Sequence, residues 1–195
     1  MDETLLSTEN EANLTKTTDT SIIDSNEQSK GIDKIAHIIN AICQNLKDII
    51  KDNSSFISYV SKDKFYLSQI PNISLNDYLK RLVKYTNMDI STLINAIIYI
   101  DIFCEKNKYI LCMNNIYLIL LSSCLLSIKF NEDVAVNLMT YSKIAGVSLD
   151  KIINLENSLY FNLHFGLFVK EDLYQNYFNY FSNFECQNSK KGKEV

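Results

Sequence analysis

The chain has 195 residues, 47% of them hydrophobic and 22% charged, with four glycines, one proline and a formal net charge of −4. This length and apolar content suit one domain of ordinary size, whereas so few glycines and prolines disfavour the many tight turns of a β-sandwich or barrel. The acidic balance gives no general attraction to phosphate backbones, so we expect no nucleic-acid partner. An all-α fold is the remaining expectation.

The N-terminal part is predicted to contain a tail, one helix and a connection. Residues 1–30 are polar and lack apolar periodicity, which predicts a disordered tail without an export signal. Over residues 31–52 isoleucine and leucine recur every three or four positions, which predicts an amphipathic helix. This helix either packs on the following domain or binds a separate partner, and we favour packing because an exposed isoleucine stripe would promote aggregation. Residues 53–72 are predicted to be a connection.

The main domain is predicted over residues 73–184, followed by a polar tail at 185–195. Its first helix runs from Leu75 to about residue 86, after a capping box formed by Ser74 and Asp77. Ser91 is predicted to cap the second helix, at about 92–106. The third, at about 114–130, is apolar on every side and must therefore be surrounded by other helices. Its longest apolar run, residues 116–128, is too short to span a bilayer, and we expect no membrane partner.

Two more helices complete the domain, and a last one follows it. The fourth covers about 134–144 and should end at Gly146, since glycine favours the left-handed conformation at a helix C-terminus. Ser148 is predicted to cap the fifth, at about 149–163. A further helix after Lys170 carries aromatic residues on one side, which we interpret as a lid over the core.

Residues with catalytic chemistry are few. The two histidines, His37 and His164, have no metal-ligand spacing, and the sequence contains no glycine-rich phosphate loop or nucleophile motif. We therefore expect no enzymatic activity, no cofactor and no metal. The cysteines are odd in number and form no Cys-x-x-Cys pair, which indicates reduced thiols of an intracellular protein. They are Cys43, Cys104, Cys112, Cys124 and Cys186.

Two pairs of charged residues stand out in the predicted helices. Lys129 ends the third helix of the domain, and Glu156 lies at the rim of the apolar face of the fifth. Such charges are costly unless they are paired or completed by a partner, so they form either an internal ion pair or a partner-facing site. Arg81, the only arginine, and Asp101 are predicted to form a structural ion pair between the first two helices, where a planar guanidinium binds a carboxylate through two bonds.

Read together, the motifs resemble a cyclin box, most closely that of the P-type cyclins, also called U-type cyclins. The resemblance covers about residues 65–181 and depends on the order and spacing of several short pieces. These pieces are Pro71-Asn-Ile-Ser-Leu-Asn-Asp-Tyr-Leu-Lys-Arg81, Lys84-Tyr-Thr86, Tyr99-Ile-Asp101, Ser127-Ile-Lys-Phe-Asn-Glu-Asp133, Tyr141-Ser-Lys-Ile-Ala-Gly146 and Asn154-Leu-Glu156.

The resemblance implies a five-helix cyclin box with flanking helices that binds and activates a cyclin-dependent protein kinase, in the nucleus or the cytoplasm. It implies that Lys129 and Glu156 contact the helix C region of the kinase, and that Arg81 and Asp101 join the first two helices. The apolar part of the kinase contact would come from Leu126, Phe130, Tyr160 and Phe165.

The chain also departs from the family pattern. The usual Asn-x-His-Arg is here Asn115-Ile-Tyr-Leu118, the usual Gly-Gly is Ala145-Gly146, and the usual Tyr-Ile-Asp-Arg is Tyr99-Ile-Asp-Ile102. A cyclin-like scaffold that tethers proteins without activating a kinase remains the main alternative. A nucleic-acid-binding module and a helical enzyme are further alternatives, but the lysines form no basic stripe.

Overall fold

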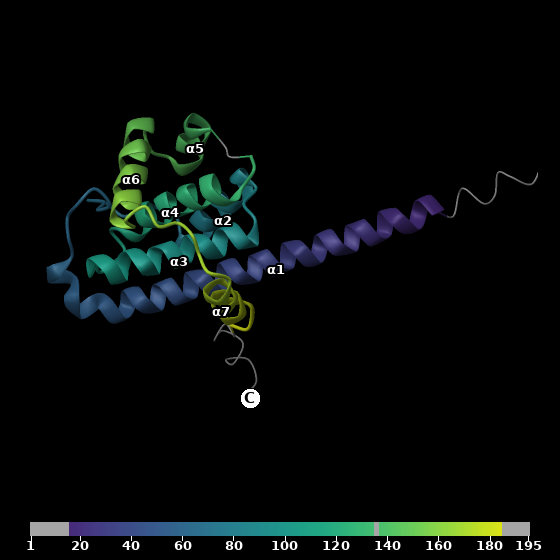
Figure 1. Ribbon diagram of the computed structural model, residues 1–195, viewed down its shortest axis with the longest axis horizontal. Helices are drawn as coiled ribbons and strands as arrows, with labels where there is room; N and C mark the ends of the chain where they lie inside the picture. The colour runs from purple at the N-terminus through teal and green to yellow at the C-terminus, as the bar shows by residue number, and fades with distance from the viewer. Residues whose placement is uncertain (1–15, 135–136, 185–195) are drawn as a thin grey trace, which may run out of the picture. The chain divides into compact units, whose positions relative to one another are not determined.

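The computed structural model describes residues 16–134 and 137–184, and within them it contains α-helices, one 3-10 helix and no strand. This confirms the predicted all-α class. The chain divides into two units, residues 1–37 and 38–195, and the site described below lies within the second (Figure 1). Residues 1–15 of the predicted N-terminal tail (1–30) and the predicted C-terminal tail at 185–195 lie outside the described residues.

The first helix is longer than the sequence predicted. Helix α1 spans Lys16–Asp52, so residues 16–30, expected to be disordered, are helical. Extending an existing helix adds a hydrogen bond for each residue without a new nucleation step, which explains why a stretch without apolar periodicity can continue it. The 3-10 helix η1, Asn53–Tyr59, follows directly.

The part of α1 within the second unit packs onto that unit, as we favoured. Ile38, Ile42 and Leu46 are buried. Two side-chain hydrogen bonds fix this packing, one from Asn76 to Asn40 at 2.7 Å and one from Asn45 to the Tyr180 hydroxyl at 3.1 Å. The isoleucine stripe is therefore part of the core here and is not available to a separate partner.

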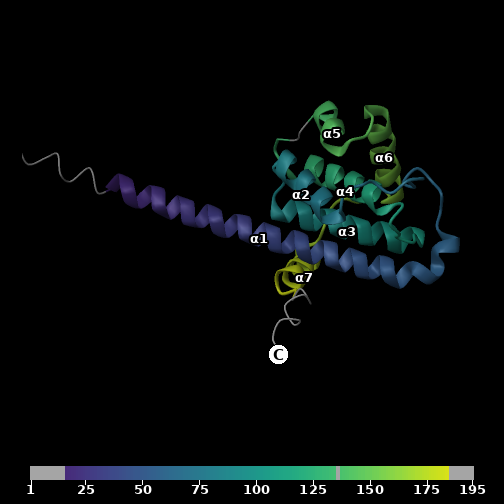
Figure 2. The same cartoon turned by 180° about the vertical axis from the view of Figure 1, so that it is seen from behind.

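Helix α4, Ile116–Asn131, is the centre of the domain. Its residues from Ile116 to Ile128 are all buried, as its apolar sequence predicted. It packs against α3 (Ile90–Asn107), α6 (Leu149–Asn162) and α2 (Leu75–Thr86), and in Figures 1 and 2 it runs between them. Two of its serines donate hydrogen bonds to α3 carbonyls, Ser127 to Thr92 at 2.6 Å and Ser123 to Ala96. These bonds satisfy buried hydroxyls that would otherwise destabilise the core.

The helix boundaries follow local signals in most places. Ser74 accepts a hydrogen bond from the Asp77 amide at 3.0 Å, and Ser148 accepts one from the Lys151 amide at 3.3 Å, which confirms both predicted caps. Helix α5, Leu138–Ala145, ends at Gly146 with φ 73°, as predicted.

Two predicted helix starts were wrong. Helix α3 begins at Ile90 after Asp89, so Ser91 is inside the helix and caps nothing. Helix α5 begins after Asn137, whose side chain accepts from the Thr140 amide at 2.8 Å, and not near residue 134.

The last helix, α7, Glu171–Ser182, packs against α3. Of its aromatic series, Phe181 is buried, Tyr177 is half-buried and Tyr180 is 51% exposed. The predicted lid therefore covers the core mainly with the last turn of the helix.

Replacing Ser74 by Ala should lower the free energy of unfolding by about 1 kcal/mol, because the first turn of α2 loses a cap. The matched change Ser91→Ala, also at an exposed serine near a helix start, should leave that free energy nearly unchanged. Urea unfolding followed by circular dichroism measures both. Equal losses in the two variants would contradict the boundary described for α3.

Candidate functional site: an ion pair beside exposed aromatic side chains

Lys129 and Glu156 meet on one surface of the domain. The Lys129 Nζ lies 2.6 Å from Glu156 Oε1 and 2.8 Å from Oε2. Helix α4 supplies Lys129 in its last turn, where the partial negative charge of the helix end favours a cation. Helix α6 supplies Glu156 from its middle and packs against α4, which it crosses in the view of Figure 1.

The ion pair is partly open to solvent. The Lys129 side chain is 36% exposed and that of Glu156 is 15% exposed. An accessible pair of this kind contributes only about 0–1 kcal/mol to stability. The pair therefore joins the two helices, as one of our two interpretations predicted, and still presents both charged groups at the surface.

The apolar residues predicted beside this pair divide into surface and interior. Phe130 is 53% exposed, Phe165 is 55% exposed, and Tyr160 is half-buried. Leu126, in contrast, is only 4% exposed. Leu126 is therefore a core residue in this structure and not a surface residue.

A strained backbone corner holds Phe165 in place. His164 and Phe165 both adopt the left-handed conformation, with φ 54° and 59°, which costs about 1 kcal/mol or more for each non-glycine residue. The Phe165 amide donates to the Tyr160 carbonyl at 3.1 Å. As a result its ring makes edge contacts with Tyr160 and Phe161, at centroid distances of 4.9 and 5.1 Å.

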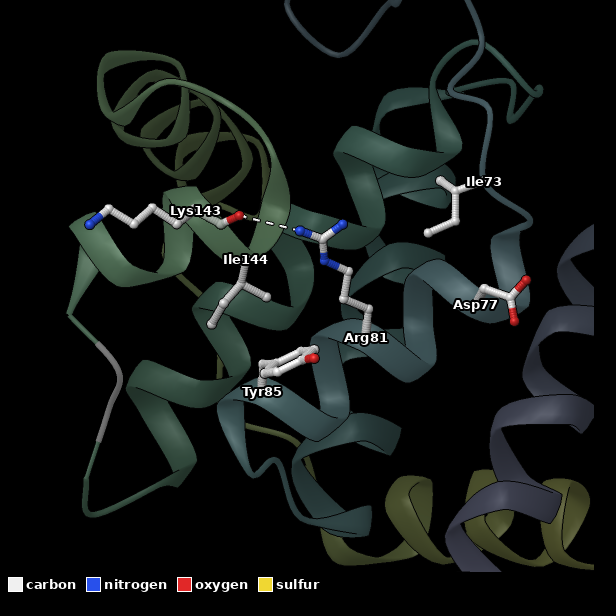
Figure 3. Close-up of a pocket in the computed structure, with 6 residues that line it drawn as sticks. All are labelled: Ile73, Asp77, Arg81, Tyr85, Lys143 and Ile144. Atoms are coloured by element: carbon white, nitrogen blue, oxygen red, sulfur yellow. Dashed lines mark hydrogen bonds between the residues drawn. The ribbon is translucent and has the colours of Figure 1, made fainter.

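The predicted ion pair between Arg81 and Asp101 is not present. Arg81 is exposed on α2, and its Nη2 donates to the Lys143 carbonyl at 3.4 Å. It lines a groove of about 510 Å³ between α2 and α5, where Figure 3 shows its guanidinium pointing toward that carbonyl. The error lies in the rotation of the helices, because Arg81 lies on the face of α2 toward α5, whereas Asp101 lies on the face of α3 toward α7.

Asp101 is paired with a tyrosine instead. The Tyr177 hydroxyl of α7 donates to Asp101 Oδ2 at 2.7 Å. Burial raises the pKa of the Asp101 carboxyl above its ordinary value, and the hydrogen bond from Tyr177 offsets part of that rise. The residue therefore anchors α7 to α3, and spacing alone could not reveal this partner.

The remaining sequence candidates show no further constellation. His37 and His164 are both exposed. Burial raises the pKa of Cys43, Cys104 and Cys124 to about 12, so these thiols stay protonated. Within the residues that the structure describes, no group of acidic, histidine and cysteine side chains could hold a metal ion. None of the described helices is both long and apolar enough to cross a membrane.

The fold is that of a cyclin-type regulator. The family description "Cyclin" matches residues 4–167, which is most of the chain, and the chain belongs to the cyclin family. It is 28% identical over 141 residues to Cyclin-U4-3 of Arabidopsis thaliana, covering 72% of this chain and 64% of that protein.

Other plant proteins give the same result. The chain is 32% identical over 108 residues to Cyclin-U4-2 of Arabidopsis thaliana, covering 55% of this chain and 50% of the relative. It is 27% identical over 128 residues to Cyclin-P3-1 of Oryza sativa subsp. japonica, covering 66% of this chain and 51% of that protein. These names agree with the resemblance to U-type and P-type cyclins. The chain spans about half to two thirds of the length of these relatives.

Replacing Asp101 by Asn should raise the free energy of unfolding at neutral pH. The folded state holds the Asp101 proton to a higher pH than the unfolded state, whose pKa is near 3.8. The wild type therefore loses stability as the pH rises from about 3.8 through the pKa of Asp101 in the folded state. Above that folded-state pKa the ionised carboxylate destabilises the fold by its full amount. Asparagine still accepts from Tyr177 but cannot ionise. In urea titrations at several pH values, the advantage of the variant should shrink as the pH falls toward 3.8.

Two further variants control this experiment. Tyr177→Phe removes the donor to a half-buried carboxylate and should destabilise the protein by roughly 1 kcal/mol. Arg81→Lys should change stability by less than about 0.5 kcal/mol, because Arg81 is exposed. A large loss in Arg81→Lys, or an Asp101→Asn variant less stable than wild type at neutral pH, would contradict these assignments.

Proposed function

We propose that this chain is a regulatory subunit that binds a cyclin-dependent protein kinase and activates it by holding the kinase helix C in its active position. The observation that carries the proposal is the partly exposed Lys129–Glu156 pair with exposed aromatic side chains beside it. Membership in the cyclin family supports the class of partner. Regulation of this kind would take place in the nucleus or the cytoplasm.

The two charged groups retain hydrogen-bonding capacity for a partner. An ammonium group has three donors, and the two short contacts to Glu156 leave capacity for a carbonyl of the kinase backbone. Each Glu156 carboxylate oxygen can accept a further bond from a kinase amide or side chain. The pair can therefore bridge to both donors and acceptors of one peptide segment, while the aromatic residues exclude water around it.

Activation in this proposal is a shift between two kinase conformations. An active kinase needs an ion pair between a strand lysine and a glutamate of helix C, and also a correctly placed metal-binding aspartate. A partner that binds only the inward position of helix C shifts the equilibrium by its differential affinity. Such a partner must be rigid, and helix α4, which is buried from Ile116 to Ile128 and bonded to α3 through its serines, supports this requirement.

The double variant Lys129→Ala/Glu156→Ala should fold normally but bind the kinase at least about tenfold more weakly, because charge-assisted bonds in an interface are lost. Removing both charges leaves neither one unpaired, so the melting temperature should change little. The kinase would be identified by affinity purification with the full chain, and its binding and activity would then be measured with purified proteins.

A matched double variant, Lys84→Ala/Glu105→Ala, removes the same charges from exposed positions of α2 and α3 and should bind as wild type does. Wild-type affinity in the Lys129/Glu156 variant would reject the assigned site. Binding of a kinase without any rise in its activity would favour the alternative, a cyclin-like scaffold that tethers proteins.

A further inference from the structure

The surface around Glu156 continues into apolar residues to which the resemblance assigned no role. Phe161, in the last turn of α6, is 63% exposed, and Phe168, in the segment that follows, is 80% exposed. Both belong to the stretch between Glu156 and Lys170, which contains no aspartate, glutamate, lysine or arginine. Large apolar side chains at such exposure, in an uncharged stretch, are typical of a contact surface.

Phe161 is continuous with the proposed kinase site through neighbouring aromatic rings, and Phe168 follows the same segment three residues after Phe165. Tyr160 follows Glu156 by one turn of α6, on the same side of the helix. The Phe165 ring touches both Tyr160 and Phe161, so these three rings form one cluster that begins one helical turn after Glu156. A partner segment bound at Glu156 would therefore meet Phe161 next along the surface.

The backbone that carries Phe168 is held in place by α3. The Tyr99 hydroxyl donates to the Leu167 carbonyl at 2.7 Å, and Leu167 itself is 9% exposed. Lys106 also donates to the Leu163 carbonyl at 3.3 Å, next to the left-handed corner. With Leu167 turned inward and its carbonyl bonded, Phe168 is presented outward from a fixed position, which lowers the entropy that binding would cost.

We infer that Phe161 and Phe168 extend the kinase contact and bind an apolar segment of the same kinase next to its helix C, so that they help to select which kinase is bound. The inference rests on the proposed function. The absence of charge favours an apolar protein segment over an acidic peptide or a nucleic acid, and continuity with Glu156 favours the kinase over a second partner. Charged groups supply one part of the recognition, and these two rings supply a separate, apolar part.

The test uses the full chain and the kinase purified with it. The double variant Phe161→Ser/Phe168→Ser should bind that kinase about tenfold or more weakly, because exposed aromatic side chains dominate many interfaces. At saturating concentrations it should still activate the kinase, since the Lys129–Glu156 pair is intact. Tyr85→Ser, at a 61% exposed ring on α2 in the groove of Figure 3, is the matched control and should bind as wild type does.

Each outcome separates this inference from the proposed function. Loss of binding in the Lys129/Glu156 variant together with unchanged binding in the Phe161/Phe168 variant would overturn the inference alone. If the wild type binds no kinase, both proposals fail. Sedimentation of the chain by itself provides the last check. If the wild type is a dimer and the Phe161/Phe168 variant is a monomer, a second copy of the chain covers this surface. That result would overturn the inference.

Discussion

The burial of α4 on all sides is the constraint on which the rest of the domain depends. A helix without a polar face is stable in water only when other helices surround it, and α2, α3 and α6 do so here. This arrangement determines where the first polar group can emerge. Lys129 is that group, at the end where α4 leaves the core, and the packing of α6 against α4 brings Glu156 to it. The position of the ion pair thus follows from the position of the buried helix.

The same packing explains the contrast between the rigid and the exposed parts of the site. Leu126 is held in the core, while Phe130, one turn later on α4, has passed beyond the surrounding helices and is exposed. On α6 the last turn ends in a left-handed corner that turns Phe165 back against Tyr160. The aromatic side chains are therefore exposed on a backbone that cannot easily relax to bury them.

Local features of the fold could be predicted from the sequence, whereas partners between helices could not. The caps at Ser74 and Ser148 and the stop at Gly146 depend on residues within one turn of each other, and all three predictions were confirmed. The prediction for Ser91 was wrong because α3 already begins at Ile90, after Asp89, although the Asp89 side chain makes no capping hydrogen bond. The Arg81–Asp101 pair was wrong because the partner of a side chain depends on how each helix is rotated about its axis. Lys129 and Glu156 were found because charges are conspicuous in apolar helices, whereas exposed phenylalanines such as Phe168 resemble core residues in a sequence.

The hydrogen bond between Asn45 and Tyr180 joins α1, which precedes the five central helices in the chain, to α7, which follows them. Together with the buried Phe181, it makes the beginning and the end of the second unit depend on each other. A fragment trimmed to the five central helices would therefore lose more than two accessory segments. It would uncover both the apolar surface on which the isoleucine stripe of α1 packs and the surface of α3 that α7 covers, and aggregation of such a shortened chain would follow from either exposure.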